Sequence, residues 1–114
     1  MVESDLYIGV MSGTSMDGID TALVRINARG IKLLAYDAYP MPTEIKTQLL
    51  SICTGQTTNL PAIGQLDHKL GHLFADAVLQ LLTRSGYQAH EIHAIGNHGQ
   101  TVFHQPSGPT PFTM

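Results

Sequence analysis

The sequence predicts an α/β domain built on a mixed sheet. Three β-rich segments follow one another through short connections, which is typical of an antiparallel meander. A long amphipathic helix and a fourth apolar segment come next, so the chain returns to the sheet after a helical crossover. With 114 residues, 43% of them hydrophobic, the chain has the length and the apolar content of one domain with one core.

The three N-terminal strands are expected at residues 6–11, 19–26 and 31–39. The first, LYIGVM, is short and apolar and is expected to be buried. The second alternates in part, which places four of its side chains on one face: Ile19, Thr21, Leu23 and Arg25. The sequence NARG between the second and third strands predicts a turn in which Gly30 adopts a positive φ.

A short helix is expected at residues 44–52, because the sequence PMP stops the third strand and Thr43 can cap a helix start. Cys53 follows this apolar segment and is the only cysteine, so an internal disulfide is excluded. For Cys53 we expect buried packing rather than a role as a nucleophile.

A long helix is expected at residues 61–83, with Asn59 as N-terminal cap and Gly86 as C-terminal cap. At about 100° per residue its apolar side chains form one stripe: Ile63, Leu66, Leu70, Leu73, Phe74, Ala77 and Leu81. A fourth strand follows at residues 92–97. The chain ends as a further alternating segment begins at Phe112, where a strand would have little to pair with, and we therefore expect a piece of a longer protein.

The composition excludes several classes of function. The net charge is −3 and the six Lys and Arg residues are scattered, so a nucleic-acid partner is not expected. No apolar run has the length of a membrane span, and the start MVESDLY is too polar for a signal peptide. A single cysteine is consistent with a reducing compartment, and we expect the cytoplasm.

The first candidate site is the stretch SGTSMDG, residues 12–18, between the first two strands. Glycines and small hydroxyl residues let backbone N–H groups approach phosphate oxygens closely. No Gly-Lys-Ser/Thr or Gly-x-Gly-x-x-Gly pattern is present, so this is neither a Walker loop nor a dinucleotide fingerprint. Without a lysine in the loop, a polyphosphate would need a divalent cation, and Asp17 and Asp20 can hold Mg²⁺ through its waters. The alternative is a polar hairpin loop in which Asp17 and Gly18 form the turn.

The second candidate site is Asn97-His98-Gly99-Gln100-Thr101, directly after the fourth strand. Ligands of open α/β sheets bind at the carboxyl ends of strands, and these side chains offer donors and acceptors suited to sugar hydroxyls. The alternative is an ordinary turn with Gly99 at positive φ.

A histidine pair gives a third pattern. His68 and His72 lie four residues apart on the long helix, a spacing that can hold a metal, and Asp76 follows one turn later. Because these residues lie opposite the apolar stripe, we interpret them as a solvated helix face.

The segments IGVMSGTSMDGIDTALV and GNHGQTVFHQP together resemble the N-terminal part of the anhydro-N-acetylmuramic acid kinase family. The resemblance spans essentially the whole chain. It implies a ribonuclease-H-like fold, with residues 1–114 as the N-terminal phosphate-binding part of the first lobe of a two-lobed sugar kinase. It also implies ATP and Mg²⁺ as cofactors, an anhydro amino sugar as substrate, N-acetylmuramic acid 6-phosphate as product, and the possibility of a homodimer at full length.

The resemblance assigns residues by their place in the two motifs. The ATP-binding segment would be Gly13, Thr14, Ser15, Met16, Asp17, Gly18, Ile19 and Asp20. The sugar site would lie at residues 97–101. Met11 stands where related sugar kinases carry an aspartate, so metal binding would shift to Asp17 or Asp20. The general base and the second nucleotide-binding lobe are expected beyond Met114, so residues 1–114 alone are expected to be inactive. The alternative is a non-catalytic remnant or module that folds with a partner chain.

Overall fold

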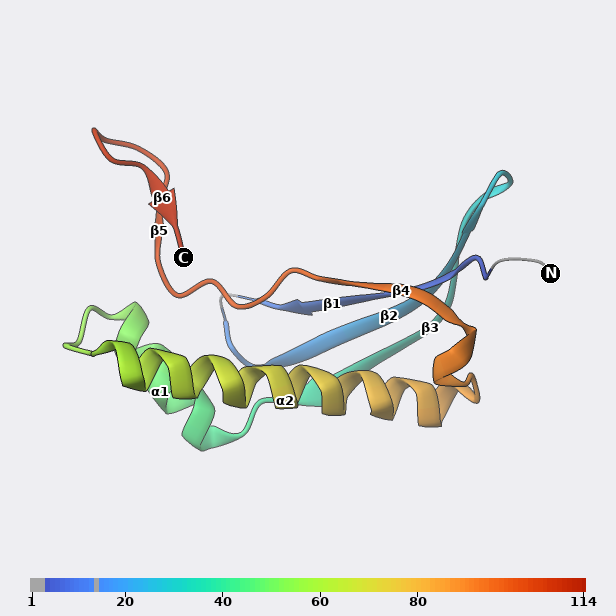
Figure 1. Cartoon of the computed structure of the whole chain (residues 1–114), viewed down its shortest axis with the longest axis horizontal. Coiled ribbons are helices and arrows are strands. Elements are labelled where there is room, and N and C mark those ends of the chain that lie inside the picture. Colours follow the sequence, from blue (N-terminus) through green and yellow to red (C-terminus); the bar gives the residue numbers. More distant parts are fainter. Residues whose placement is uncertain (1–3, 14) are drawn as a thin grey trace.

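A four-stranded mixed sheet with strand order β3-β2-β1-β4 forms one layer of the structure, and two helices form the other (Figure 1). The structure is a computed structural model that describes residues 4–13 and 15–114. The predicted α/β class and element order are confirmed. The elements are β1 (Leu6–Ser12), β2 (Gly18–Asn27), β3 (Gly30–Pro40), α1 (Thr43–Cys53), α2 (Leu60–Ser85), the 3₁₀ turn η1 (Ala89–Glu91), β4 (Ile92–Asn97), β5 (His104–Gln105) and β6 (Phe112–Thr113).

The strand pairing brings the carboxyl ends of β1 and β4 together. Strands β1, β2 and β3 form the expected antiparallel meander, and Gly30 adopts the predicted positive φ of 121° in the turn between β2 and β3. Strand β4 pairs with β1 in parallel, with Val10 opposite Asn97. Because parallel strands end at the same edge, the loop after Ser12 and the segment after Asn97 begin side by side.

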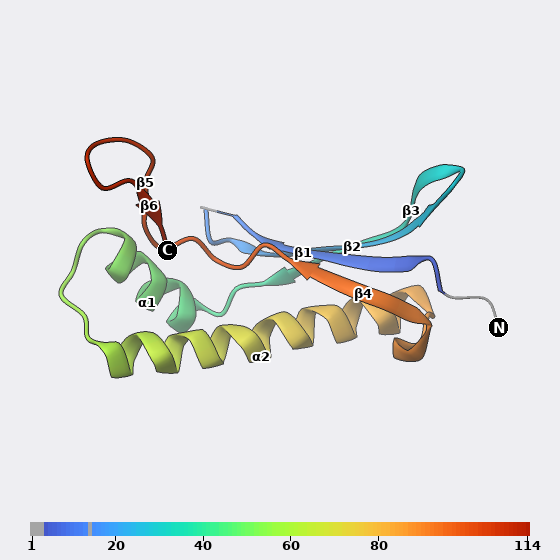
Figure 2. The same ribbon diagram turned by 45° about the horizontal axis from the view of Figure 1, so that its top comes forward.

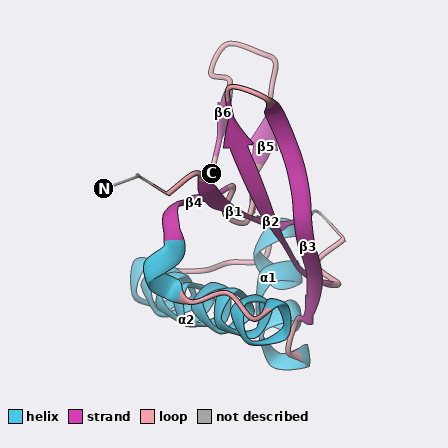
Figure 3. Cartoon of the chain, turned by 90° about the vertical axis from the view of Figure 1, so that its right-hand side faces the viewer, coloured by secondary structure: helices cyan, strands magenta, loops and turns pink. Residues whose placement is uncertain are grey.

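Both helices cover the same face of the sheet (Figures 2 and 3). The alternating face of β2 predicted from the sequence points to them, with Ile19 and Leu23 fully buried. The predicted apolar stripe of α2 is confirmed apart from Ile63, which is only half-buried. Eight α2 side chains are buried: Leu66, Leu70, Leu73, Phe74, Ala77, Val78, Leu81 and Leu82. Neither helix among the described residues is long and apolar enough to cross a membrane.

The caps of α2 are as predicted. The Asn59 side chain accepts a hydrogen bond from the Ala62 N–H at 2.9 Å, and Gly86 has a left-handed φ of 80°.

Two expectations for α1 are wrong. The N-cap is Pro42, not Thr43, since the fixed φ of proline (−58°) already turns the chain and the helix begins one residue earlier. Cys53 is exposed rather than buried, because it is the last residue of α1 and an exposed loop follows.

The C-terminal segment forms a hairpin that stands away from the main sheet (Figure 1). Phe112 and Thr113 pair with Gln105 and His104, so the expectation that a strand at Phe112 would find little to pair with is wrong. The Phe103 and Phe112 rings stack with centroids 4.8 Å apart. The turn-forming sequence between the two short strands brings them together locally, and no distant partner is needed.

Asp37 ties β3 to α2. Its carboxylate accepts hydrogen bonds from Gln80 Nε2 and Arg84 Nη1, both at 2.7 Å, and the residue is buried. The Gln80 hydrogen bond, together with the Arg84 guanidinium, holds the pKa of Asp37 below its usual value. A carboxyl with a lowered pKa in the folded state stabilises the fold above about pH 4, and this contribution is lost as the pH falls through the folded-state pKa.

We expect Asp37→Asn to lower stability at pH 7 and to flatten the dependence of stability on pH below about pH 4. Urea unfolding midpoints measured between pH 7 and pH 3 test this. Asp67→Asn, on the exposed face of α2, is the matched control and is expected to keep the wild-type slope. An Asp37→Asn protein with an unchanged slope would show that this carboxylate is not the acid-sensitive contact.

Candidate functional site at the carboxyl ends of β1 and β4

The two sequence motifs, about 85 residues apart in the chain, meet at one end of the sheet. The loop after β1 and the segment after β4 leave the same edge (Figures 1 and 2). The His98 N–H donates to the Val10 carbonyl oxygen at 3.0 Å, which continues the β1–β4 pairing beyond the last strand residue. The structure therefore brings together the two segments that the sequence indicated separately.

Side chains join the two motifs directly. The Ser12 hydroxyl donates to Gln100 Oε1, and Ser12 is only 3% exposed. Gln100 Nε2 donates to the Thr101 carbonyl oxygen at 3.0 Å and lies 3.5 Å from the Gly13 carbonyl oxygen. The start of the first loop is thus held by the second motif.

Met16 fixes the course of the first loop. Its N–H donates to the Gly13 carbonyl oxygen at 3.1 Å, and its side chain is 2% exposed. Met16 has a φ of 55°, which is uncommon for a non-glycine residue. The loop does join two antiparallel strands, as in the alternative interpretation, but neither Asp17 nor Gly18 adopts a left-handed φ, so the prediction that these two residues form the turn is wrong.

The other predicted residues of this loop differ in what they present to solvent. Ser15 and Asp17 are exposed, and Gly13 and Gly18 are half-buried. The Ile19 side chain lies fully in the core, as does that of Met16, so these two residues can offer a ligand only their backbone. Thr14 lies outside the described residues.

Lys46 supplies a positive charge that the loop itself lacks. Its Nζ lies 2.9 Å from Asp17 Oδ1. The Lys46 hydrogen bond and its charge lower the pKa of the exposed Asp17 carboxyl. Sequence reasoning missed Lys46, because it lies on α1, 29 residues after Asp17, and no local pattern marks it.

Asp20 lies on the sheet face opposite the helices and borders a shallow hollow of about 320 Å³. The Tyr36 hydroxyl donates to Asp20 Oδ1 at 2.8 Å, and this carboxylate raises the pKa of Tyr36. Gly9, Ala22 and Gly96 lie between the larger residues of this hollow, so the backbone of the strands is accessible there. The hollow is lined by Gly9, Val10, Met11, Asp20, Thr21, Ala22, Tyr36, Gly96 and His98. Asp20 and His98, one from each motif, therefore share it.

The second motif forms a turn, as its alternative interpretation predicted. Gly99 has a φ of 78°, and its N–H donates to Asn97 Oδ1 at 2.8 Å. His98 is exposed, whereas Gln100 and Thr101 are half-buried. Turn geometry and a ligand-binding role are compatible here, since the turn is what directs His98 toward the hollow on the outer face.

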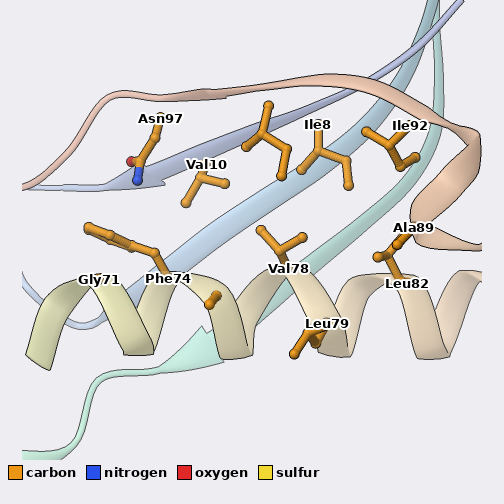
Figure 4. A pocket seen from close by; sticks show the side chains of 12 residues that line it. Ile8, Val10, Gly71, Phe74, Val78, Leu79, Leu82, Ala89, Ile92 and Asn97 are labelled. Carbon is orange, nitrogen blue, oxygen red and sulfur yellow. The ribbon is translucent and has the colours of Figure 1, made fainter.

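A larger cavity of about 450 Å³ lies between α2 and β4 and is not the motif site (Figure 4). Ile8, Val10 and Ile92 of the sheet face Phe74 and Val78 of α2 across it. None of the described residues that line it is charged, and among the predicted site residues that the structure describes, Asn97 alone reaches it. Phosphate chemistry is therefore not expected in this groove.

The histidine pair lies on the exposed side of α2, as predicted. His68 Nε2 and His72 Nε2 are 3.2 Å apart, and both residues are exposed. Within residues 4–13 and 15–114, no group of three or more His, Cys, Asp or Glu side chains is arranged to hold a metal ion.

A three-stranded meander, a helical crossover to a parallel fourth strand, and a small-residue loop at the end of the first strand agree with the arrangement expected for the N-terminal part of a sugar-kinase lobe. The family model described as anhydro-N-acetylmuramic acid kinase matches residues 5–114. The chain belongs to the anhydro-N-acetylmuramic acid kinase family.

Curated relatives support this assignment over the whole chain. The anhydro-N-acetylmuramic acid kinase of Vibrio parahaemolyticus is 70% identical over 110 residues, which are 96% of this chain and 30% of the relative. That of Vibrio cholerae is 62% identical over 114 residues, 100% of this chain and 31% of the relative. That of Aliivibrio fischeri is 55% identical over 95% of this chain and 29% of the relative. The chain thus spans about 30% of the length of these relatives.

Proposed function

We propose that residues 1–114 form the phosphate-binding part of the first lobe of an ATP-dependent kinase that acts on an anhydro amino sugar. The observation that carries this proposal is the contact of Ser12 with Gln100, which joins the two family motifs into one site. The second nucleotide-binding lobe and the general base would lie in the part of the relatives that this chain does not span. We also predict that the intact protein forms a homodimer and is located in the cytoplasm.

The proposed reaction adds water to the sugar and transfers one phosphoryl group. The water oxygen bonds to C1 as the C1–O6 bond of the 1,6-anhydro ring breaks, and the general base takes the water proton. O6 then bonds to the γ-phosphorus of ATP as the bond to ADP breaks. The product is N-acetylmuramic acid 6-phosphate, and most of the rate enhancement would come from positioning and charge stabilisation.

The first loop fits a phosphate group. Among the described residues that are not its chain neighbours, a Cβ atom at Gly13 would have only Ser15 Oγ within 4 Å, at 3.9 Å, which leaves room for a ligand on the described side of this backbone. The exposed Ser15 hydroxyl and the Lys46 ammonium add donors and positive charge. The ATP-contacting segment is proposed as residues 13–20, with Met16 and Ile19 contributing only through the backbone.

Mg²⁺ would be held through its waters by one carboxylate rather than two. The charge of Asp17 is already offset by the Lys46 ammonium, whereas Asp20 accepts from the neutral Tyr36 hydroxyl and keeps its negative charge free for a metal. Mg²⁺ normally keeps several waters and needs one or two carboxylates besides the phosphates. Asp20 is therefore the stronger candidate. The metal would neutralise charge on the phosphates when bound.

The anhydro sugar is proposed to meet the second motif through His98, an exposed residue that lines the outer hollow. An imidazole can both donate to and accept from sugar hydroxyls, depending on its tautomer. The remaining residues of the motif shape the turn that places His98.

An assay of ATP-dependent phosphorylation of the anhydro sugar tests the proposal. The intact protein that carries this segment is expected to convert the anhydro sugar and ATP to the 6-phosphate and ADP. Residues 1–114 alone are expected to show no turnover above the buffer control, because about 70% of the length of the relatives is missing. Robust turnover by residues 1–114 would contradict the proposed division of the site, and an inactive intact protein would favour a non-catalytic module.

A further inference from the structure

We propose that Gln100 is a positioning residue that holds the phosphate loop, rather than a residue that contacts the sugar. The inference rests on the proposed function, because it assigns different roles to two residues of the second motif: His98 would contact the sugar and Gln100 would hold the first loop. It starts from the place of Gln100 in the structure: the residue belongs to the proposed sugar segment, yet its side chain lies against the first loop.

The hydrogen-bonding groups of the Gln100 side chain are already engaged. A glutamine amide has one carbonyl oxygen and two N–H donors. Its oxygen accepts from the Ser12 hydroxyl, and its nitrogen faces the carbonyl oxygens of Thr101 at 3.0 Å and Gly13 at 3.5 Å. Both N–H donors therefore face protein carbonyl oxygens, and a sugar oxygen could accept from this amide only by displacing one of these contacts.

Burial makes the contact with Ser12 costly to lose. Ser12 is 3% exposed, and Gln100 is half-buried. A buried hydroxyl that loses its acceptor has little access to water as a replacement, so its desolvation is no longer compensated. The Ser12 side chain therefore depends on Gln100 for its position, whereas the neighbouring Gly13 carbonyl oxygen also accepts from the Met16 N–H at 3.1 Å.

His98, two residues earlier, has the opposite character. Its side chain is exposed, and it borders the hollow on the outer face of the sheet together with Asp20. Its backbone N–H is fixed by the Val10 carbonyl, so the residue is well placed without using its ring. Within one motif, His98 faces the ligand side and Gln100 faces the protein side.

Removal of the Gln100 amide is therefore expected to weaken the binding of ATP at the first loop rather than the binding of the sugar. Gln100→Ala would release the Ser12 hydroxyl and remove one of the two contacts of the Gly13 carbonyl oxygen, and so loosen the loop proposed to meet ATP, although residue 100 lies in the proposed sugar segment. A residue that reads the sugar would show the reverse pattern, with the effect confined to the sugar KM.

Steady-state kinetics of the intact protein test this. Gln100→Ala is expected to raise the KM for ATP by roughly five- to twentyfold, as expected for one or two lost hydrogen bonds with a buried group left unpaired, and to raise the sugar KM by less than about threefold. Ser12→Ala is expected to raise the KM for ATP in the same direction. Gln105→Ala is the matched control, because the Gln105 side chain donates to the nearby Thr110 carbonyl oxygen within the C-terminal hairpin, and this variant is expected to behave as wild type.

A conservative variant separates positioning from general damage to the fold. The carboxylate of Gln100→Glu can still accept from Ser12 but cannot donate to the Gly13 and Thr101 carbonyls, so an intermediate KM for ATP is expected. A double-mutant cycle of Ser12→Ala and Gln100→Ala, measured by thermal unfolding, is expected to show non-additivity, since the two side chains share one contact.

These readouts distinguish the inference from the function on which it rests. A raised sugar KM with an unchanged KM for ATP, or additive unfolding effects of the two substitutions, would overturn the positioning role. An intact wild-type protein that does not phosphorylate the sugar would instead overturn the proposed function, and the unfolding cycle would still decide whether Gln100 holds Ser12.

Discussion

Gly18→Ala is expected to destabilise the fold by about 2 kcal/mol, within the range of 1–3 kcal/mol found for overpacking. A Cβ atom at Gly18 would lie 2.8 Å from the Tyr39 carbonyl oxygen, which is shorter than real Cβ contacts allow. The obstructing atom is backbone of the paired strand β3, so no side chain can rotate away, and the first residue of β2 would have to move. The small gain from restricting the unfolded chain does not offset this.

Gly13→Ala is the matched control on the other side of the same loop. Within the described part of the chain, its Cβ would meet Ser15 Oγ at 3.9 Å, an ordinary contact, and Gly13 does not adopt a left-handed φ. We expect its unfolding free energy to stay within about 0.5 kcal/mol of wild type. If Gly13 faces the ATP phosphates as proposed, the added methyl group would still raise the KM for ATP about tenfold, equivalent to about 1.4 kcal/mol.

Urea unfolding and steady-state kinetics on the two variants separate the roles of the two glycines. The expected pattern is a stability loss for Gly18→Ala and an ATP effect without stability loss for Gly13→Ala. Equal destabilisation by both variants would contradict the assignment of Gly18 to strand packing. A Gly13→Ala protein with a wild-type KM for ATP would place the phosphates elsewhere.

The fold was predictable from the sequence because its signals are local. The apolar stripe of α2 has helical period, Asn59 and Gly86 mark its ends, and the alternation of β2 identifies its buried face. The misplaced cap at Thr43 and the exposed Cys53 both concern the ends of α1. Helix ends are sensitive to the neighbouring residue, here Pro42, and to what the rest of the fold leaves uncovered.

The site was only partly predictable, because its contacts join distant parts of the chain. The motifs identified the backbone segments of the site. They did not predict that Gln100 contacts Ser12 or that Lys46 pairs with Asp17. The first contact depends on the parallel pairing of β1 with β4, and the second depends on where α1 packs after β3. A pairing between strands separated by a helical crossover leaves no periodic signal at the residues that it brings together.

Substitution of Met16 is the second change from which we expect a large loss of stability, because this residue combines a buried side chain with a left-handed backbone conformation. Its side chain is 2% exposed in the core, and its backbone has a φ of 55°. Met16→Ala is expected to lower the unfolding free energy by 2–4 kcal/mol, a cost of the kind found for large-to-small changes in protein cores, about 2–5 kcal/mol. The loop would also lose its attachment to the core, so we expect the KM for ATP of the intact protein to rise.

Two variants of similar size separate packing from backbone conformation. Met16→Leu nearly conserves volume and is expected to cost less than about 1.5 kcal/mol. Met16→Ile adds a branch at Cβ, which is poorly tolerated at positive φ, and is expected to cost more than Met16→Leu although both residues are apolar and similar in volume. Thermal or urea unfolding measures the difference. If Leu and Ile are equally tolerated, the left-handed backbone at residue 16 does not constrain the loop, and core packing alone explains why a methionine lies among the small polar residues of the proposed phosphate loop.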